Sequence, residues 1–155
     1  MEIYNRADIV NFMNTGTTQA PVWTRMQGFT DMATSSNTIT YSRRYVDEKQ
    51  EREDTTGYSK AIAYTFDRIV DNSIHERLAE IMDNEVVGAD IEILSVNVKT
   101  NEAKRRTYSV IPDTAGDGTD AYQYSGTFRA KGEATNGTAT ISADGLTATF
   151  TEASV

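Results

Sequence analysis

Residues 58–83 read YSKAIAYTFDRIVDNSIHERLAEIMD, and the spacing of their large apolar side chains changes once. Over 58–70 large side chains occupy every second position, which is the alternation of a β-strand with one buried face. From residue 73 the apolar positions recur three and four apart, as in a helix with a single apolar stripe. We therefore expect a strand over 58–70 and one α-helix over about 73–83. The candidate N-caps are Asp71, Asn72 and Ser73, and Glu76 has capping-box spacing from Ser73.

The rest of the chain contains further alternating segments separated by turn residues. Threonine is common, with 22 residues, whereas there are 10 glycines and only 2 prolines, a composition that suits twisted sheets. The expected strands, about eight in all, lie within 20–32, 38–46, 58–70, 89–112 (two), 121–134, 137–143 and 146–153. Asn136 begins an N-G-T sequon, which we interpret as a hairpin turn. The pattern predicts a mainly β fold, a β-sandwich or barrel-like domain with the helix on its flank.

Length and charge limit the classes of function. The chain has 155 residues, a formal net charge of −8 and no cysteine. It fits one domain over 1–155, in which residues 1–20 look irregular and are expected to form an N-terminal arm. We see neither an export signal nor a membrane span, and thiolate metal sites and cysteine nucleophiles are excluded. The acidic balance argues against a phosphate-binding nucleic-acid protein, so DNA should be repelled.

Isolated residues that could carry chemistry lack the partners that such chemistry requires. The sole histidine, His75, falls off the apolar stripe of the expected helix, and we expect it to be a solvated surface residue. Zinc sites and catalytic triads need further ligands or partners that the sequence does not supply. Asp113, Asp117 and Asp120 lie among glycines, but their spacing differs from a calcium-binding loop and favours a plain loop. We therefore expect no catalytic residue, no metal site and no cofactor.

Acidic pairs and tyrosines leave two weaker alternatives open. Glu51 with Glu53, or Glu80 with Asp83, could serve a hydrolase, although nothing around them is apolar enough to shift a pKa. The tyrosines could line the pocket of a small-ligand-binding β-barrel, although core and interface packing is their commoner use. The tyrosines concerned are Tyr41, Tyr45, Tyr58, Tyr64, Tyr122 and Tyr124.

A strongly charged segment interrupts the strands. Residues 43–54 read RRYVDEKQERED and carry nine charges in twelve positions. We expect a long charged loop over about 45–57, and connections of that length in compact domains are commonly functional. Its interleaved acids and bases suit electrostatic registry with a second copy of the same protein. The residues expected to make this subunit or ring contact are Tyr45, Asp47, Glu48, Lys49, Glu51, Arg52, Glu53 and Asp54.

Four segments, taken in order, resemble the major tail tube proteins of long-tailed, siphophage-type bacteriophages. They are VWTRMQGFTDM at 22–32, YVDEKQERED at 45–54, GYSKAIAYTFDRIVDNSIHERLAEI at 57–81 and YQYSGTFRAKGEATNGTATI at 122–141. None of them is a catalytic signature, and the order of all four carries the resemblance. It covers about residues 20–143.

The resemblance implies a structural virion protein that is not an enzyme and needs no cofactor. Its subunits would form hexameric rings that stack into a hollow tube, through which DNA passes without specific binding. In related tubes the long loop reaches a neighbouring subunit, which corresponds here to residues 45–57. Expected partners are further copies of the chain and the tape measure, distal tail and tail terminator proteins, with assembly in the host cytoplasm and no role for a membrane. A tube subunit of a contractile phage tail, phage-like bacteriocin or secretion system remains an alternative.

Overall fold

The computed structural model describes residues 1–117 and 119–153, which form a mainly β structure with one α-helix, as the sequence predicts. The helix α1 covers Ser73–Asp83, and a short 3-10 helix covers Arg6–Asp8. The ten strands of the described residues are β1 (Ile9–Asn14), β2 (Trp23–Arg25), β3 (Phe29–Ser35), β4 (Thr38–Arg43), β5 (Arg52–Tyr58), β6 (Ala61–Asp67), β7 (Asp90–Asn97), β8 (Glu102–Asp117), β9 (Gln123–Ile141) and β10 (Thr147–Glu152).

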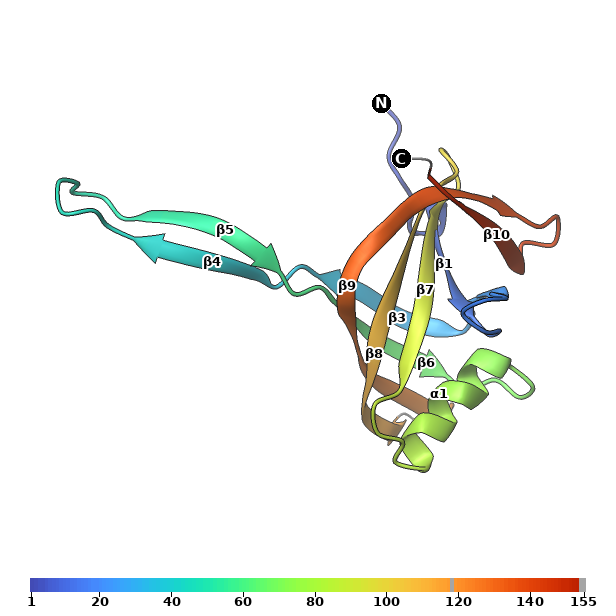
Figure 1. The fold of residues 1–155 in the computed structure, drawn as a ribbon. Helices are drawn as coiled ribbons and strands as arrows, with labels where there is room; N and C mark the ends of the chain where they lie inside the picture. Colours follow the sequence, from blue (N-terminus) through green and yellow to red (C-terminus); the bar gives the residue numbers. More distant parts are fainter. Residues whose placement is uncertain (118, 154–155) are drawn as a thin grey trace.

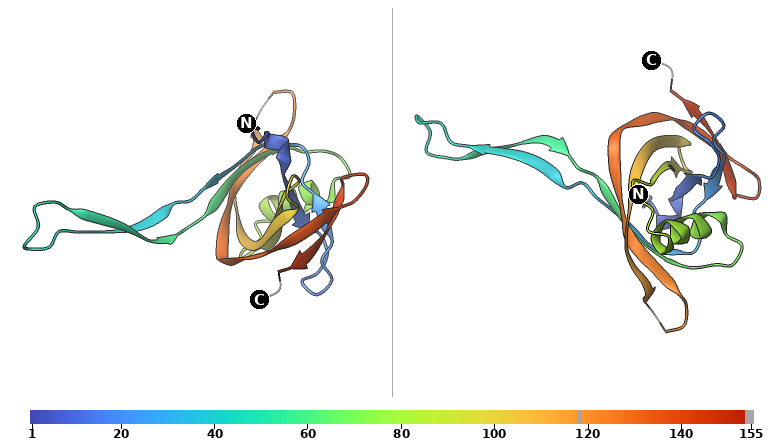
Figure 2. Two further views of the ribbon diagram at one scale, coloured as in Figure 1. Left: turned by 90° about the horizontal axis from the view of Figure 1, so that it is seen from above. Right: turned by 60° about the horizontal axis from the view of Figure 1, so that its bottom comes forward.

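Eight of the strands form one antiparallel sheet in the order β10-β2-β1-β7-β8-β9-β6-β3. Because β10 also pairs with β9, the strands β2, β1, β7, β8, β9 and β10 close into a small barrel. The other half of β9 pairs with β6, which in turn pairs with β3. The sheet curves, with α1 packed against it (Figure 2). The barrel-like fold with a flanking helix is therefore confirmed.

Strand β7 separates two apolar cores because both of its faces are covered. Ile91 and Ile93 belong to the larger core, which contains the buried side of α1 and residues of β6, β8 and β9. Leu94 and Val96 belong to the smaller core inside the barrel, where they join Trp23. A strand with both faces buried needs apolar residues on both, which explains the nearly continuous run in β7.

The helix α1 begins and ends at the predicted residues. Asn72 is its N-cap, and its side-chain oxygen accepts hydrogen bonds from the backbone N–H groups of Ile74 (3.1 Å) and His75 (3.2 Å). Leu78 is 1% exposed, so the predicted apolar stripe faces the sheet. Of the three candidate caps, the structure selects Asn72.

Several predicted strand boundaries are wrong, because turns divide segments that alternate continuously in sequence. The segment 20–32 forms β2 and β3, separated by a turn at Gly28, which has a φ of 76°. The segment 58–70 is broken after Tyr58, and β6 begins at Ala61. The total is accordingly ten strands where about eight were expected.

The two chain segments expected to be irregular contain strands. Residues 1–20 do not form a continuous arm, since β1 lies within them between β2 and β7. The loop predicted around Asp113 is in part the end of β8, which continues to Asp117. Both segments are held by neighbouring strands, whose hydrogen bonds outweigh weak local preference.

The hairpin turn predicted at Asn136 is also wrong. Asn136 lies within β9, in register with Lys104 of β8. The next residue, Gly137, pairs with β8 on one side and β10 on the other, and a Cβ atom there would overlap the carbonyl oxygen of Thr151. Glycine is thus required by close backbone approach and not by a turn.

Across the described residues, none of the helices is both long enough and apolar enough to span a bilayer.

Candidate functional site

A two-stranded ribbon formed by β4 and β5 projects from the body of the protein (Figure 1, Figure 2). These strands pair only with each other, and we call residues 38–58 the arm. At its base, Asn37 has a φ of 44°, and its side-chain nitrogen donates to the carbonyl oxygen of Ser59 at 3.1 Å. The long loop predicted over 45–57 is therefore wrong in part, because residues 52–58 are a strand. The connection itself is shorter and covers 44–51.

The arm carries every residue predicted to contact a neighbouring subunit. Among these residues Glu48 is half-buried and the others are exposed: Tyr45, Asp47, Lys49, Glu51, Arg52, Glu53 and Asp54. The structure therefore gathers them on one projecting element.

Two ion pairs cross the arm. A guanidinium nitrogen of Arg43 lies 2.5 Å from a carboxylate oxygen of Asp54, and Arg52 makes a two-bond contact with Glu48 at 2.5 and 2.8 Å. Within the described residues, Asp47, Lys49, Glu51 and Glu53 form no ion pair, so their charges are free to meet a partner.

Tyrosine rings hold the guanidinium groups of the arm. The Cζ of Arg43 lies 5.1 Å from the ring centre of Tyr41 and 5.6 Å from that of Tyr45, and its Nε donates to the Tyr45 hydroxyl at 2.9 Å. The hydrogen bonds to Tyr45 and Asp54 raise the pKa of Arg43. The Cζ of Arg52 lies 5.7 Å from the ring centre of Tyr45, which is in the connection between β4 and β5. Stacked cations and rings give this exposed ribbon an ordered surface.

His75 is fully buried, so the prediction of a solvated surface histidine is wrong. Its Nδ1 accepts a hydrogen bond from the backbone N–H of Ile69 at 3.0 Å, and its Nε2 therefore carries the proton and donates to the Gln27 carbonyl oxygen at 2.6 Å. The ring stacks on Phe66, with centroids 4.5 Å apart. Burial lowers the pKa of His75, and the ring fastens α1 to two turns. Spacing on the helix alone could not reveal the turns that cover it.

The remaining candidates for chemistry do not form a site. Within the described residues no group of histidine and acidic side chains could hold a metal ion, while the side chain of Asp117 lies outside that description. Glu51 and Glu53 are exposed on the arm, and Glu80 and Asp83 are exposed on α1. The hydrolase alternative thus gains no support from the structure.

The six tyrosines named above are dispersed over the described part of the chain. Tyr64 and Tyr124 are buried in the larger core, where burial raises the pKa of Tyr64 to about 12. The others are exposed, three of them on the arm. A surface cavity of about 560 Å³ lies beside β7, β8 and β9, and no tyrosine lines it. The small-ligand alternative therefore loses the feature on which it depended.

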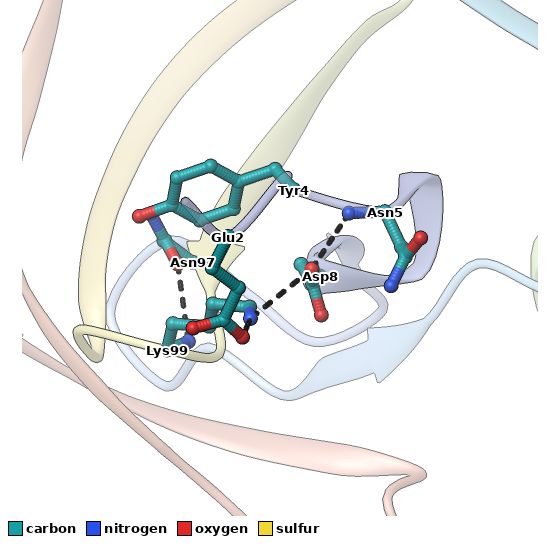
Figure 3. A network of polar contacts seen from close by, with 6 residues as sticks. All are labelled: Glu2, Tyr4, Asn5, Asp8, Asn97 and Lys99. Carbon is teal, nitrogen blue, oxygen red and sulfur yellow. Dashed lines mark hydrogen bonds and ion pairs between the residues drawn. The ribbon is translucent and has the colours of Figure 1, made fainter.

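The N-terminal residues fold back on the turn between β7 and β8 (Figure 3). The Lys99 ammonium pairs with the carboxylate of Glu2, lies 3.9 Å from Asp8 and sits 5.7 Å from the centre of the Tyr4 ring. The Asn97 side chain donates to the Tyr4 hydroxyl at 3.4 Å. Exposed contacts of this kind are weak individually, so only the combination fastens the segment.

Comparison with solved structures finds a shared fold. A chain from the tail of an empty GTA particle, determined by helical refinement with C6 symmetry, matches with a TM-score of 0.63 and 15% identity. The match covers 85% of this chain and 97% of that chain. A chain from the six-fold symmetrised baseplate of the anti-feeding prophage matches with a TM-score of 0.45 and 7% identity, over 83% of this chain and 89% of that chain. No protein-family model and no curated protein matches the sequence.

Proposed function

We propose that this chain is a structural virion protein, the repeating subunit of a phage-type tail tube. The observation that carries the proposal is the fold shared with a chain of the GTA particle tail, over 97% of that chain. The C6 symmetry of that tail supports hexameric rings, which would stack into a hollow tube. The four ordered sequence segments that resemble siphophage tube proteins point to the same role.

An unpaired strand edge supports association between copies. Among the described residues, strand β3 ends the main sheet and pairs with β6 alone, so no strand covers its other edge. Five of its seven residues are exposed. Open edges of this length tend to pair with another chain, and closure of copies into a ring removes them.

The arm supports contact with a neighbouring subunit or ring. An isolated two-stranded ribbon is marginally stable in water and gains stability when it packs on a surface. The proposed contact residues are those predicted from sequence: Tyr45, Asp47, Glu48, Lys49, Glu51, Arg52, Glu53 and Asp54.

The charge of the chain suits passage of DNA without binding. Each subunit has a formal net charge of −8. Because duplex DNA carries about one negative charge per 1.7 Å of its axis, a basic wall would retain it whereas an acidic one lets it slide. No catalytic step and no cofactor are part of this function.

The proposed setting is the tail of a siphophage, assembled in the host cytoplasm. Tape measure, distal tail and tail terminator proteins would be the partners besides further copies of the chain. A tube subunit of a contractile tail, bacteriocin or secretion system would need the same kind of ring. A sheath gene beside the gene for this chain would favour that second setting.

Electron microscopy of the concentrated protein tests the proposal. We expect rings or hollow filaments with six-fold symmetry, and a protein that stays a monomer at every concentration would overturn the proposal. The matched variant replaces residues 41–54 by an Asn-Gly turn, which joins the paired residues Thr40 and Thr55 as a short hairpin. It should keep the circular dichroism and unfolding of the parent and fail to form tubes.

A further inference from the structure

The two faces of the arm differ in chemistry. Facing residues of an antiparallel ribbon share a side, so the register assigns each residue of β4 to one face. One side, the aromatic face, consists of Ile39, Tyr41, Arg43 and Tyr45 with Arg52 and Asp54 across the ribbon. The other, the hydroxyl face, consists of Thr38, Thr40, Ser42, Glu53 and Thr55, with Tyr58 at its base. This difference between the faces suggests that they have different surroundings in an assembly.

The aromatic face has the composition of an interface core. Ile39 and Tyr41 are 53% and 56% exposed, and Tyr45 is 47% exposed, so much of their apolar surface meets water. Tyrosine and arginine are the residues enriched at the centres of protein interfaces. The hydroxyl face presents mostly small polar side chains, which lose little by staying in water, together with Glu53 and, at its base, Tyr58.

The charges of the aromatic face are already paired within the arm. Arg43 contacts Asp54, and Arg52 contacts Glu48 on the adjoining turn. Burying a paired charge costs much less than burying an unpaired one. The rings of Tyr41 and Tyr45 also restrict Arg43, so less side-chain freedom remains to be lost on binding.

We infer that the aromatic face is the side of the arm that docks on a second copy of this chain, while the hydroxyl face stays exposed. The inference rests on the proposed function and names the surface that it uses. The arm points away from its own body, which leaves another molecule to cover this face (Figure 1).

Charge complementarity favours a second copy as the occupant. Around the end of the arm Arg44, Asp47, Lys49 and Glu51 form no ion pair within the described residues, so charges of both signs are exposed there and suit a protein partner better than uniformly anionic DNA or membrane. Strands β8 and β9 of the same chain also expose charges of both signs, among them Lys104, Arg129, Glu102 and Glu133. Interleaved charges on the arm and on this strand pair fit association between copies, in which acids of one copy meet bases of the next.

The size of the face sets the strength of the contact. A standard interface uses about 20 to 30 residues on each side, whereas the aromatic face of the arm offers six. A single docking event should therefore be weak, and many repeated contacts would hold an assembly. The chain is expected to be monomeric when dilute.

Two substitutions at neighbouring positions separate the faces. I39K and T40K add the same charge to the same strand, and both native side chains are exposed. We expect I39K to raise the protein concentration needed for assembly about tenfold or more, as loss of a central interface residue does. T40K should change it less than about threefold. Equal effects of the two substitutions would overturn the inference.

Thiol labelling gives a second readout, taken at protein concentrations at which each variant assembles. Since the chain has no cysteine, Y41C and T40C each introduce a single thiol. In assembled tubes we expect Y41C to react with a maleimide at least about tenfold more slowly than in the monomer, and T40C to react at nearly its monomer rate. Protection of T40C alone, or of neither thiol, contradicts the inference while leaving the tube function intact.

The remaining outcomes are also informative. Protection of Y41C in the dilute monomer on addition of duplex DNA or anionic vesicles would assign the face to a different partner and overturn the inference. Failure of the unaltered chain to form any polymer would instead overturn the proposed function, and the docking face with it.

Discussion

Replacement of His75 by phenylalanine tests whether the buried, uncharged imidazole stabilises the fold by hydrogen-bonding two turns to α1. Phenylalanine keeps a ring beside Phe66 but leaves the Ile69 N–H and the Gln27 carbonyl without their partner. Each unsatisfied buried backbone group costs about 1–3 kcal/mol, so we expect loss of both partners in H75F to lower the free energy of unfolding by about 2–6 kcal/mol at neutral pH.

The pH dependence of this change in the free energy of unfolding is a more specific test than its size. Burial lowers the pKa of His75 in the folded state and the nearby Arg68 adds to the shift, while the hydrogen bond to the Gln27 carbonyl oxygen and, more weakly, Asp67 oppose it. The unfolded chain then binds the proton first, so stability is present above the unfolded pKa near 6.5 and falls as the pH falls below it. The loss approaches about 1.4 kcal/mol per pH unit until the folded group also titrates. H75F lacks this pH-dependent contribution. The difference in free energy of unfolding between the parent and H75F should therefore become smaller as the pH falls.

Urea unfolding from about pH 7.5 to about pH 5 measures both quantities. The control is L78A, which removes a buried side chain and should cost about 2–5 kcal/mol without altering the pH slope, because His75 remains. A constant gap between the parent and H75F across this range would refute the assignment of His75 as a buried neutral group.

Three further substitutions test the helix and the larger core. L78D should unfold the protein, because an unpaired charge would be buried beneath α1, and a folded variant by circular dichroism would contradict the helix placement. N72A should cost about 1 kcal/mol in urea unfolding through loss of the N-cap, whereas S73A should cost less. Burial raises the pKa of Tyr64 to about 12, so its contribution to stability is present below pH 10 and is lost as the pH rises toward 12. Ultraviolet titration should show a late-ionising tyrosine that Y64F removes, and an unchanged titration curve would contradict its burial.

The sequence predicts some helices and strands more accurately than others. Helix α1 was predicted to the residue because a cap and an apolar stripe are local signals. The strand predicted over 58–70 exists only as β6, over Ala61–Asp67, because Tyr58 ends β5 and the alternation in the sequence continues across the break at Ser59. Strand β9 was divided wrongly at Asn136, because two neighbouring strands override a dipeptide that favours turns.

The arm shows the same limit at a functional element. Its charges and its position between strands were evident in the sequence, but residues 52–58 were interpreted as part of a loop. Glu53 and Asp54 are poor strand formers in isolation. They form β5 because β4 lies opposite and Arg43 pairs with Asp54, a contact between residues eleven positions apart.

The sequence by itself determined the mainly β class, the single helix with its limits, and the presence of a charged excursion between strands, because periodicity, caps and composition act over a few residues. Only the tertiary structure decided that β10 closes a barrel against β2 and β9, that His75 is buried, and that the aromatic and hydroxyl residues of the arm lie on opposite faces. These features depend on which distant segments meet. Register and burial arise from packing between segments, which no local pattern of residues contains.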